Sequence, residues 1–198
     1  MAKVTDVRVL TGAALNGALD DVAALRMVVF RAFPYLYDGD LAYERDYLQT
    51  YCDSKDAILV GAFDGDRLIG ASTGTPLVDH ADDFGAAFAG TGHDLAEVFY
   101  CAESVLLPAY RGQGVGHQFF DLRESHARGL GFSKIAFCGV QRRSDHPLRP
   151  ADYQPLDPFW TARGYAKVSG AVAQFSWKDL GEAQETLKPL QFWLRALG

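Results

Sequence analysis

The sequence contains little cysteine, no long apolar run and no cluster of basic residues. Its three cysteines, Cys52, Cys101 and Cys138, are odd in number and far apart, which argues against a disulfide framework and against a zinc site with paired ligands. No apolar run approaches the ~20 residues that span a bilayer, and the opening residues lack the apolar core of a signal peptide. We therefore expect a cytoplasmic protein with reduced thiols, no bound metal and no membrane partner.

The charge balance argues against nucleic acid as a partner. The chain carries 25 acidic and 19 basic residues, a formal net charge of −6, and no lysine or arginine patch offsets this balance. Such a surface repels a phosphate backbone. The 198 residues are 48% hydrophobic, which suits a single domain over residues 1–198 with a sizeable core.

The most informative segment is residues 104–116, where an apolar strand leads into a glycine-rich turn and then a helix. The strand ends at Pro108, and Gly112, Gly114 and Gly116 alternate in the turn. With so little side-chain bulk, backbone N–H groups can converge on phosphate oxygens beside the positive end of the following helix. The segment predicts a site for a phosphate-bearing cofactor, with a plain tight turn as the alternative.

Two common phosphate-binding motifs do not fit this segment. The third glycine has the wrong spacing for the G-x-G-x-x-G dinucleotide fingerprint, and no Gly-Lys-Ser/Thr of a P-loop follows. What remains is Arg-x-x-Gly-x-Gly over residues 111–116, directly after a strand end at 106–108. This pattern resembles the acyl-CoA pyrophosphate loop of the GNAT superfamily of N-acetyltransferases. Residues 159–165 resemble the aromatic helix end that follows the superfamily's fifth strand, and residues 96–102 lie where its fourth strand is expected.

The resemblance implies both a fold and a cofactor. The fold is α/β (α+β), a GNAT-like mixed central sheet of six or seven strands flanked by helices and splayed between strands four and five, near residues 103–107. Acetyl-CoA is the implied acyl donor, with its pantetheine arm beside strand four. The implied cofactor-binding residues are Val105, Leu106, Leu107, Arg111, Gly112, Gln113, Gly114, Val115, Gly116 and His117. An exposed first-turn histidine is the alternative interpretation of His117.

The apolar periodicity predicts the remaining elements. Strands are expected at 4–10, 57–63, 67–75, 134–140, 173–177 and 190–197. The second and third of these form a hairpin, and the last is either a strand or a short helix. Helices are expected from a cap at Asn16 to near Phe33-Pro34, after a turn at 38–40, over 81–89 and over 116–130. The proline-rich segment 141–157 should be irregular.

Acyl transfer to an amine needs a base, and two glutamates are well placed to supply one. Glu103 stands three residues before Leu106, where the superfamily often has an acidic residue facing the acceptor, and it is the first candidate. Glu97 begins the same strand in a context that resembles the histone-type members, and it is the second. Either carboxylate could instead cap a helix or pair with a loop arginine.

The general acid is the point at which the chain departs from the superfamily's pattern. Many members have a tyrosine where this chain has Trp160, and an indole N–H is a donor without accessible acidity. Either the thiolate leaves unassisted, or another group, Tyr153 or Tyr110 for example, supplies the proton. Both tyrosines could equally be packing aromatics.

The expected acceptor is a primary amine on a small molecule, entering beside Glu103 under segments 33–38 and 141–157. Tyr35 and Tyr37 are predicted to line its pocket, because superfamily members often wall that pocket between the first two helices, and ordinary packing is the alternative for both. The arginines of 142–149 could contact the cofactor phosphates, contact an anionic acceptor or merely solvate the loop. A homodimer is compatible with the sequence.

Other chemistries are compatible with parts of this pattern. Cys101 or Cys138 could form an acyl-enzyme with His126 or His146 as base, but the apolar flanks favour buried thiols. A non-catalytic acyl-CoA sensor would bind the cofactor without turnover. Transfer of another acyl group, or transfer to a hydroxyl, also fits a loop that recognises only phosphate.

Overall fold

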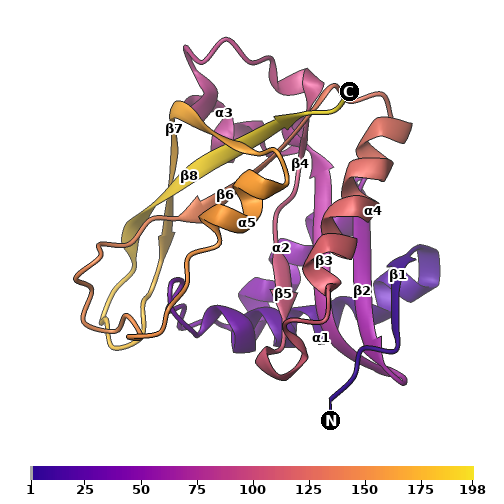
Figure 1. Cartoon of the computed structure of the whole chain (residues 1–198), viewed down its shortest axis with the longest axis vertical. Coiled ribbons are helices and arrows are strands. Elements are labelled where there is room, and N and C mark those ends of the chain that lie inside the picture. The colour runs from indigo at the N-terminus through magenta and orange to yellow at the C-terminus, as the bar shows by residue number, and fades with distance from the viewer. Residues whose placement is uncertain (1) are drawn as a thin grey trace.

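The computed structural model describes residues 2–198, apart from the side chains of Thr50 and Cys52. Its centre is an eight-stranded mixed sheet in the order β1-β2-β3-β4-β6-β8-β7, with β5 paired to β3 (Figure 1). The strands are β1 (Asp6–Leu10), β2 (Ile58–Asp64), β3 (Arg67–Pro76), β4 (Val98–Tyr100), β5 (Ser104–Leu106), β6 (Lys134–Val140), β7 (Ala166–Trp177) and β8 (Thr186–Ala196). The helices are α1 (Gly12–Phe30), α2 (Leu41–Asp53), α3 (Ala81–Phe88), α4 (Val115–Gly129) and α5 (Asp157–Ala162).

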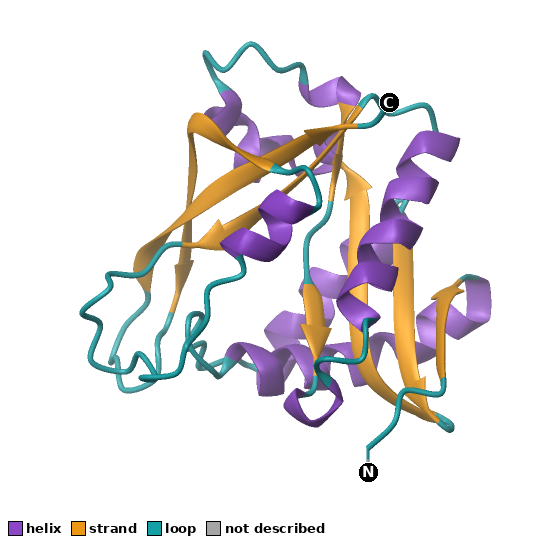
Figure 2. Ribbon diagram, in the orientation of Figure 1, coloured by secondary structure: helices purple, strands orange, loops and turns teal. Residues whose placement is uncertain are grey.

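Helices cover both faces of the sheet (Figure 2). α1 and α2 pack on β1, β2, β3 and β5, and α3 extends the same layer over β7. α4 and α5 cover the opposite face. The alternation along β4 shows this division, since Phe99 packs on the α4 side and Tyr100 on the α3 side.

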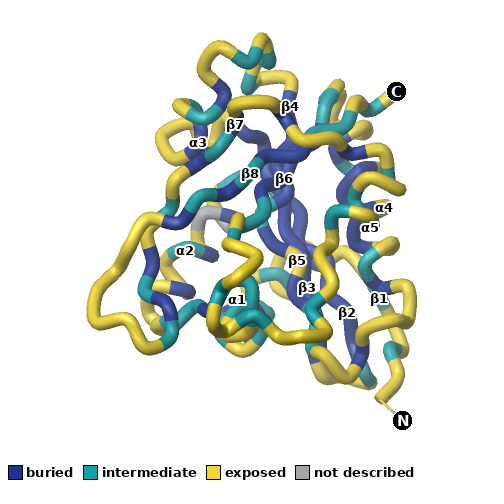
Figure 3. Tube along the Cα trace, turned by 60° about the vertical axis from the view of Figure 1, so that its left-hand side comes forward, coloured by how far each residue is buried: buried dark blue, intermediate teal, exposed yellow. Residues whose placement is uncertain are grey.

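The central strands are apolar on both faces because both faces are covered. All residues of β2 from Ile58 to Phe63 are buried, as is β3 from Leu68 onward. Figure 3 shows that the buried part of the trace runs through the middle strands, while the connecting loops are exposed. The predicted hairpin at 57–75 is therefore confirmed and forms the centre of the core.

Strands β5 and β6 diverge in the middle of the sheet. β4 pairs in parallel with β6 as far as Tyr100 and Ala136, and Cys101 N still donates to Ala136 O at 2.8 Å. Beyond that point β5 pairs with β3, and among the described strands its other edge has no partner. The predicted splay between strands four and five is confirmed, with the expected fourth strand divided into β4 and β5.

A β-bulge separates β4 from β5. Three residues, 101–103, lie opposite two residues of β3, 73 and 74. Ala102 N donates to Thr73 O, and Thr73 N donates to Glu103 O, each at 3.2 Å. Because the extra residue reverses the side-chain alternation, Glu103 points to the α1 face together with Ala102. In a regular strand Glu103 would face α4.

The start of α1 differs from the prediction. The helix begins at Gly12, four residues before the expected cap at Asn16, and ends at Phe30 rather than near Phe33-Pro34. Thr11, the N-cap, makes no side-chain cap hydrogen bond. Packing of the buried face of α1 on the sheet, rather than a capping side chain, accounts for the earlier start.

The start of α2 agrees with the prediction. Asp40 ends the expected turn, and its Oδ1 accepts hydrogen bonds from Ala42 N and Tyr43 N, each at 3.0 Å. A carboxylate in this position satisfies amides that the first helical turn leaves unpaired. The turn at 38–40 thus acts as a helix cap, as its composition indicates.

The last two strands are longer than the sequence predicts. β7 begins at Ala166 rather than 173, because a register shift between Lys167 and Val172 interrupts the alternation, with Gly170 at φ +79°. The segment left open as a strand or a short helix is a strand, β8. It lies between β6 and β7 and pairs antiparallel with both.

Candidate active site

The loop at 111–116 leads into α4 and keeps its backbone accessible. Gly112 and Gly114 have φ values of +77° and +80°, a region that favours glycine, and a Cβ on either would meet nothing within 4 Å. Gly114 is the N-cap of α4 and supplies no side-chain acceptor to the first helical amides. Accessible amides at a helix N-terminus fit a pyrophosphate group.

The side chains of this loop turn away from its amides. Gln113 Oε1 accepts from Val4 N, and Gln113 Nε2 donates to Ala2 O, each at 3.1 Å. His117 Nδ1 lies 3.2 Å from Arg163 Nη1. Within residues 2–198, the exposed Arg111 guanidinium has no acidic partner, so this cation is available to an anionic ligand.

The unpaired edge of β5 presents backbone groups to the gap beside β6. Glu103 O and Leu107 N both bond to β3. The alternation of an antiparallel ladder turns Val105 the same way and directs the N–H and C=O of Ser104 and Leu106 into the gap. An extended ligand that carries amides can pair with such an edge as an added strand.

A cavity of about 100 Å³ meets the sheet where β5 and β6 diverge. Ala102 and Glu103 of the bulge and Cys138 of β6 line its inner end. Most of the wall is aromatic and comes from segment 33–38, α2, α3 and β7. Tyr35 and Tyr37, predicted from the sequence to line the acceptor pocket, both line this cavity. Burial raises the pKa of each, so both hydroxyls stay protonated near neutral pH.

Three buried charged side chains meet at the inner end of the cavity. Arg26 of α1 donates from Nε to Glu44 Oε2 and from Nη1 to Glu103 Oε2, and Thr73 Oγ1 donates to Glu103 Oε1 at 2.7 Å. Arg26, Glu44 and Glu103 are 8%, 0% and 3% exposed. Burial alone would lower the pKa of Arg26, but the charges of Glu103 and Glu44 raise it well above its usual range. One guanidinium is therefore the counter-charge of two carboxylates.

One oxygen of this cluster lacks a hydrogen bond. Glu44 Oε1 is buried and has no hydrogen-bond partner among the described residues. Glu44 is fully buried and lines the cavity. A buried carboxylate oxygen without a donor is costly. A donor that enters the cavity would remove that cost.

The bulge is also held from the opposite face of the sheet. Arg123 of α4, 1% exposed, donates from Nη1 to Thr73 O at 3.2 Å and to Glu103 O at 3.1 Å. Its Nη2 donates to Ser104 Oγ at 2.9 Å. These bonds fix the backbone on which the Glu103 side chain is oriented.

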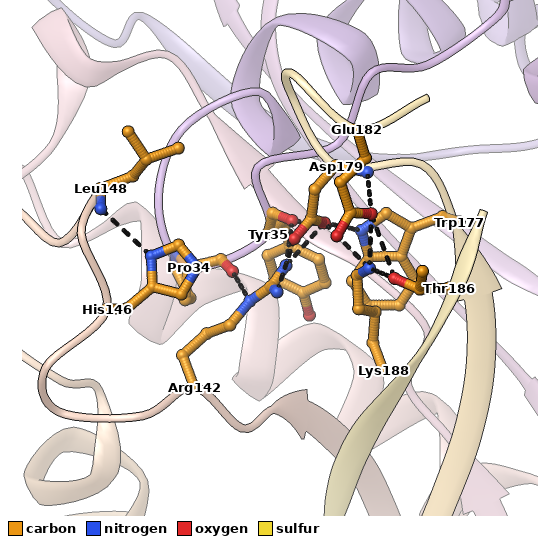
Figure 4. Close-up of polar contacts among 10 residues, drawn as sticks. All are labelled: Pro34, Tyr35, Arg142, His146, Leu148, Trp177, Asp179, Glu182, Thr186 and Lys188. Atoms are coloured by element: carbon orange, nitrogen blue, oxygen red, sulfur yellow. Dashed lines mark hydrogen bonds and ion pairs between the residues drawn. The ribbon is translucent and has the colours of Figure 1, made fainter. Parts of the chain in front are cut away.

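The cavity wall at Tyr35 is fixed by an ionic cluster (Figure 4). Arg142 donates to Pro34 O and Tyr35 O, each at 2.7 Å, and pairs with Asp179 at 2.6 Å. Trp177 Nε1 donates to Asp179 Oδ1 at 2.9 Å. From the sequence, Arg142 could contact the cofactor phosphates, contact an anionic acceptor or be solvated. In the structure it instead connects the proline-rich loop to the wall of the cavity.

Residues 23–150 match the model of the acetyltransferase (GNAT) family. The chain belongs to this family. No curated protein matches its sequence. GNAT proteins use acetyl-CoA as acyl donor, and the loop at 111–116 fits the pyrophosphate of that cofactor. Within residues 2–198, no helix is long and apolar enough to cross a membrane.

Solved structures with the same fold cover almost the whole GNAT chain. A ribosomal-protein-alanine N-acetyltransferase from Brucella melitensis matches with a TM-score of 0.62 and 12% identity over 97% of this chain and 99% of that one. An N-acetyltransferase from Staphylococcus aureus matches with a TM-score of 0.60 and 8% identity over 98% and 100%. A Salmonella typhimurium acetyltransferase solved with acetyl-CoA matches with a TM-score of 0.61 and 8% identity over 98% and 95%. These low identities show the shared fold alone.

The structure places the two predicted bases far apart. Glu97 precedes β4, pairs with Lys134 at the surface and has a side chain that is 51% exposed. Glu103 lies six residues further along nearly extended chain, roughly 20 Å at the usual rise per residue. Only Glu103 of the two lines the cavity of the GNAT protein.

The predicted proton donors lie outside the residues that line this cavity. Tyr153 packs edge-on against Phe33 with 4.7 Å between ring centroids, and burial raises its pKa. Tyr110 donates to Asp64 Oδ2 at 2.7 Å. Trp160 packs against Trp193 in the core. Tyr153 would have to leave its packing site to serve as the acid.

The geometry does not favour a cysteine nucleophile. Burial raises the pKa of Cys101 to about 11 and that of Cys138 to about 12, so both remain thiols near neutral pH. His126 Nε2 contacts Asp56 O at 2.9 Å, and His146 Nδ1 accepts from Leu148 N at 3.2 Å. Each histidine is thus engaged elsewhere.

Sequence reasoning missed Arg26, Glu44, Thr73 and Arg123. Arg26 carried a signal, because it is the one charged residue in an otherwise apolar run over 25–30. Glu44 carried another, because it lies at helical spacing from the buried Leu48 and Tyr51. Thr73 and Arg123 carried none, since their roles depend on strand register and on the bulge.

Proposed function

We propose that this GNAT protein transfers the acetyl group of acetyl-CoA to a primary amine on a small molecule, with Glu103 as the general base. The observation that carries the proposal is the placement of Glu103 and Glu44 at the inner end of an aromatic cavity where β5 and β6 diverge. Two carboxylates served by one guanidinium favour an ammonium group. The small volume of this cavity, about 100 Å³, suits a small molecule.

In this proposal Glu103 takes the proton of the bound ammonium. Thr73 and Arg26 orient the Glu103 carboxylate, and Arg123 holds the backbone beneath it. The cradle at 111–116 and the free edge at Ser104 and Leu106 hold the cofactor. Acetyl-CoA supplies the thioester, whose C–S bond breaks as the C–N bond forms. The first proton of the ammonium has passed to Glu103, which releases it to solvent, and the second proton, lost by nitrogen as the amide forms, ends on the CoA sulfur.

Glu103→Gln tests the assignment of the base. Loss of a general base lowers the rate by about 100-fold or more, so kcat/KM for acetyl-CoA-dependent acetylation of a primary-amine panel should fall by that factor. CoA release, followed with a thiol reagent, is the measurement. Glu97→Gln is the matched control, because it removes a surface carboxylate of the same type. Full activity of Glu103→Gln with loss in Glu97→Gln would reassign the base.

The cofactor assignment has its own test. Acetyl-CoA and CoA should raise the unfolding temperature by mass action, whereas NAD and ATP at the same concentration should not. Stabilisation without CoA release across the amine panel would favour the sensor over the enzyme. Other acyl-CoA donors and hydroxyl acceptors in the same assay decide the acyl group and the acceptor atom.

A further inference from the structure

A second, wider cavity continues the first toward solvent. It has a volume of about 450 Å³ and shares five lining residues with the inner cavity. The shared residues are Tyr37, Tyr43, Phe175, Ser176 and Trp177. The two cavities thus form one path with carboxylates at its inner end and an aromatic middle section.

The outer end of this path is acidic. Four carboxylates line it, against one lysine. Asp38 pairs with Lys178 Nζ at 2.8 Å and with Arg31 Nη1 at 3.5 Å, and Asp40 caps α2.

Asp83 of α3 and Glu185 before β8 are exposed, and neither has a lysine or arginine partner within residues 2–198. Asp83 Oδ2 lies 3.7 Å from Nδ1 of the buried His80, whereas Glu185 has no basic side chain within ion-pair distance among the described residues. These two carboxylates form the mouth of the path, and neither is paired with a lysine or an arginine.

Nearby cations do not offset these charges. Lys188 lies 3.0 Å from Glu182 and 3.6 Å from Asp179, and Arg142 pairs with the same Asp179 (Figure 4). Arg123 donates to the backbone from the α4 face and does not line either cavity. Across both cavities, six carboxylates face two cations, Arg26 and Lys178.

Carboxylates from both ends of the path affect the pKa of Tyr43, which lines both cavities. Burial and the charge of Glu44, with smaller effects of Asp83 and Glu185, raise the pKa of Tyr43. At the inner end, Glu44 Oε1 is fully buried without a donor. Burial, and after it an interaction with the Glu44 carboxylate, raise the pKa of Tyr37, so this neutral hydroxyl is the protein group that shares the carboxylate with Arg26. A ligand N–H group in the path would give Oε1 the hydrogen bond that it lacks.

We infer that the acceptor is an aliphatic diamine, with one amino group at Glu103 and Glu44 and the second, as an ammonium, at Asp83 and Glu185. The methylene chain lies between the aromatic rings that the two cavities share, where its burial is favourable. This inference rests on the proposed acetyl transfer and names its substrate class. Acetylation turns the inner amine into a neutral amide, so the product loses its attraction to the inner carboxylates and leaves.

Three acceptors of equal chain length test the inference with acetyl-CoA at saturation. Butane-1,4-diamine carries the second ammonium, butylamine lacks it, and 4-aminobutanoate replaces it with a carboxylate. We expect kcat/KM for the diamine to exceed that of butylamine by at least about tenfold, which corresponds to ~1.4 kcal/mol. The amino acid should be the poorest acceptor, because its carboxylate meets the acidic mouth.

Two double variants that each remove two negative charges test the contribution of Asp83 and Glu185. In Asp83→Asn/Glu185→Gln, the diamine-to-butylamine ratio of kcat/KM should fall to within about twofold of one. Asp21→Asn/Asp46→Asn removes two exposed carboxylates from α1 and α2 that line neither cavity, and it should keep the wild-type ratio. Calorimetric titration of butane-1,4-diamine without acetyl-CoA should show the same loss in the mouth variant.

The outcomes separate the two proposals. Equal turnover of diamine and butylamine by the wild type overturns the diamine inference and leaves acetyl transfer intact. An unchanged ratio in the mouth variant also overturns the inference. Diamine binding that depends on Asp83 and Glu185, without turnover of any amine, supports the site and overturns the proposed acetyl transfer.

Discussion

Arg26 neutralises part of the charge of two buried carboxylates at once. Its guanidinium is the one cation among the lining residues of the inner cavity, and it hydrogen-bonds to both Glu44 and Glu103. The Tyr47 ring lies 4.4 Å from its Cζ and shields the group from water. Breaking a buried ion pair from one side leaves an uncompensated charge, which costs more than the intact pair contributes.

Arg26→Gln should therefore destabilise the fold strongly. We expect the free energy of unfolding in urea to fall by about 3–5 kcal/mol, because two buried carboxylates lose their counter-charge. Arg45→Gln is the control: its pair with Asp20 at 2.6 Å is exposed, and such pairs contribute about 1 kcal/mol or less. Similar losses in both variants would contradict this account of the cluster.

Individual residues show how far the sequence alone leads. The family pattern predicts that Glu103, Tyr35 and Tyr37 lie around one pocket, and all three line the inner cavity. The pattern does not predict the face to which Glu103 points, because a single extra residue in the bulge reverses that face. Alternation along 98–106 without the bulge would have placed Glu103 beside Cys101, under α4.

Among the elements, the loop and N-terminus of α4 are the part best matched to a ligand. Gly114 combines a left-handed backbone with the N-cap position, and both are required for amides to face outward. A side chain at Gly114 would meet no neighbour, so the backbone conformation, not space, demands glycine.

Gly114→Ala should raise the Kd for acetyl-CoA and lower the free energy of unfolding by about 1 kcal/mol, since alanine resists this φ. Calorimetric titration and urea unfolding measure the two effects. Gly129→Ala, at the other end of α4, provides the control, because that glycine has ordinary φ and open space. It should keep the Kd and leave stability equal or slightly higher. An unchanged Kd in Gly114→Ala would argue against the cradle.

Elements with strong local signals were predictable, and those defined by distant packing were not. The hairpin of β2 and β3 has its Asp-Gly-Asp turn, and α2 has Asp40 as its cap. The N-cap of α1 makes no side-chain hydrogen bond, so the sequence carries no capping signal for its start. In the first half of β7, a register shift at 167–172 interrupts the alternation of apolar residues. Neither feature leaves a local pattern that periodicity could detect.

Across the whole molecule, several thiols and tyrosine hydroxyls are buried that are neutral at pH 7 and lose a proton only at high pH. Burial raises the pKa of Cys101 to about 11 and that of Cys138 to about 12, and it also raises those of Tyr35 and Tyr37. A group whose folded pKa lies above its unfolded value stabilises the fold fully below the unfolded pKa. That contribution is lost as pH rises through the folded value.

The free energy of unfolding should therefore fall as pH rises above 9, the ordinary value for the thiols. At pH 10 each buried thiol accounts for about 1.4 kcal/mol of the loss. Urea unfolding of the wild type at pH 8 and pH 10 measures it, and Cys101→Ala should reduce the difference by that amount. Constant stability over this range would contradict the burial of these groups.

The position of β8 has a consequence for how the protein is made. β6 and β7 are both synthesised before β8, yet the two never pair with each other, because β8 occupies the place between them. On a ribosome, the hairpin of β2 and β3 can close early, while β7, which carries Trp177, waits for its partner strand. The half that contains the β2–β3 hairpin can thus take shape first, and the aromatic cavity lined by Trp177 is completed only when the last strand joins the sheet.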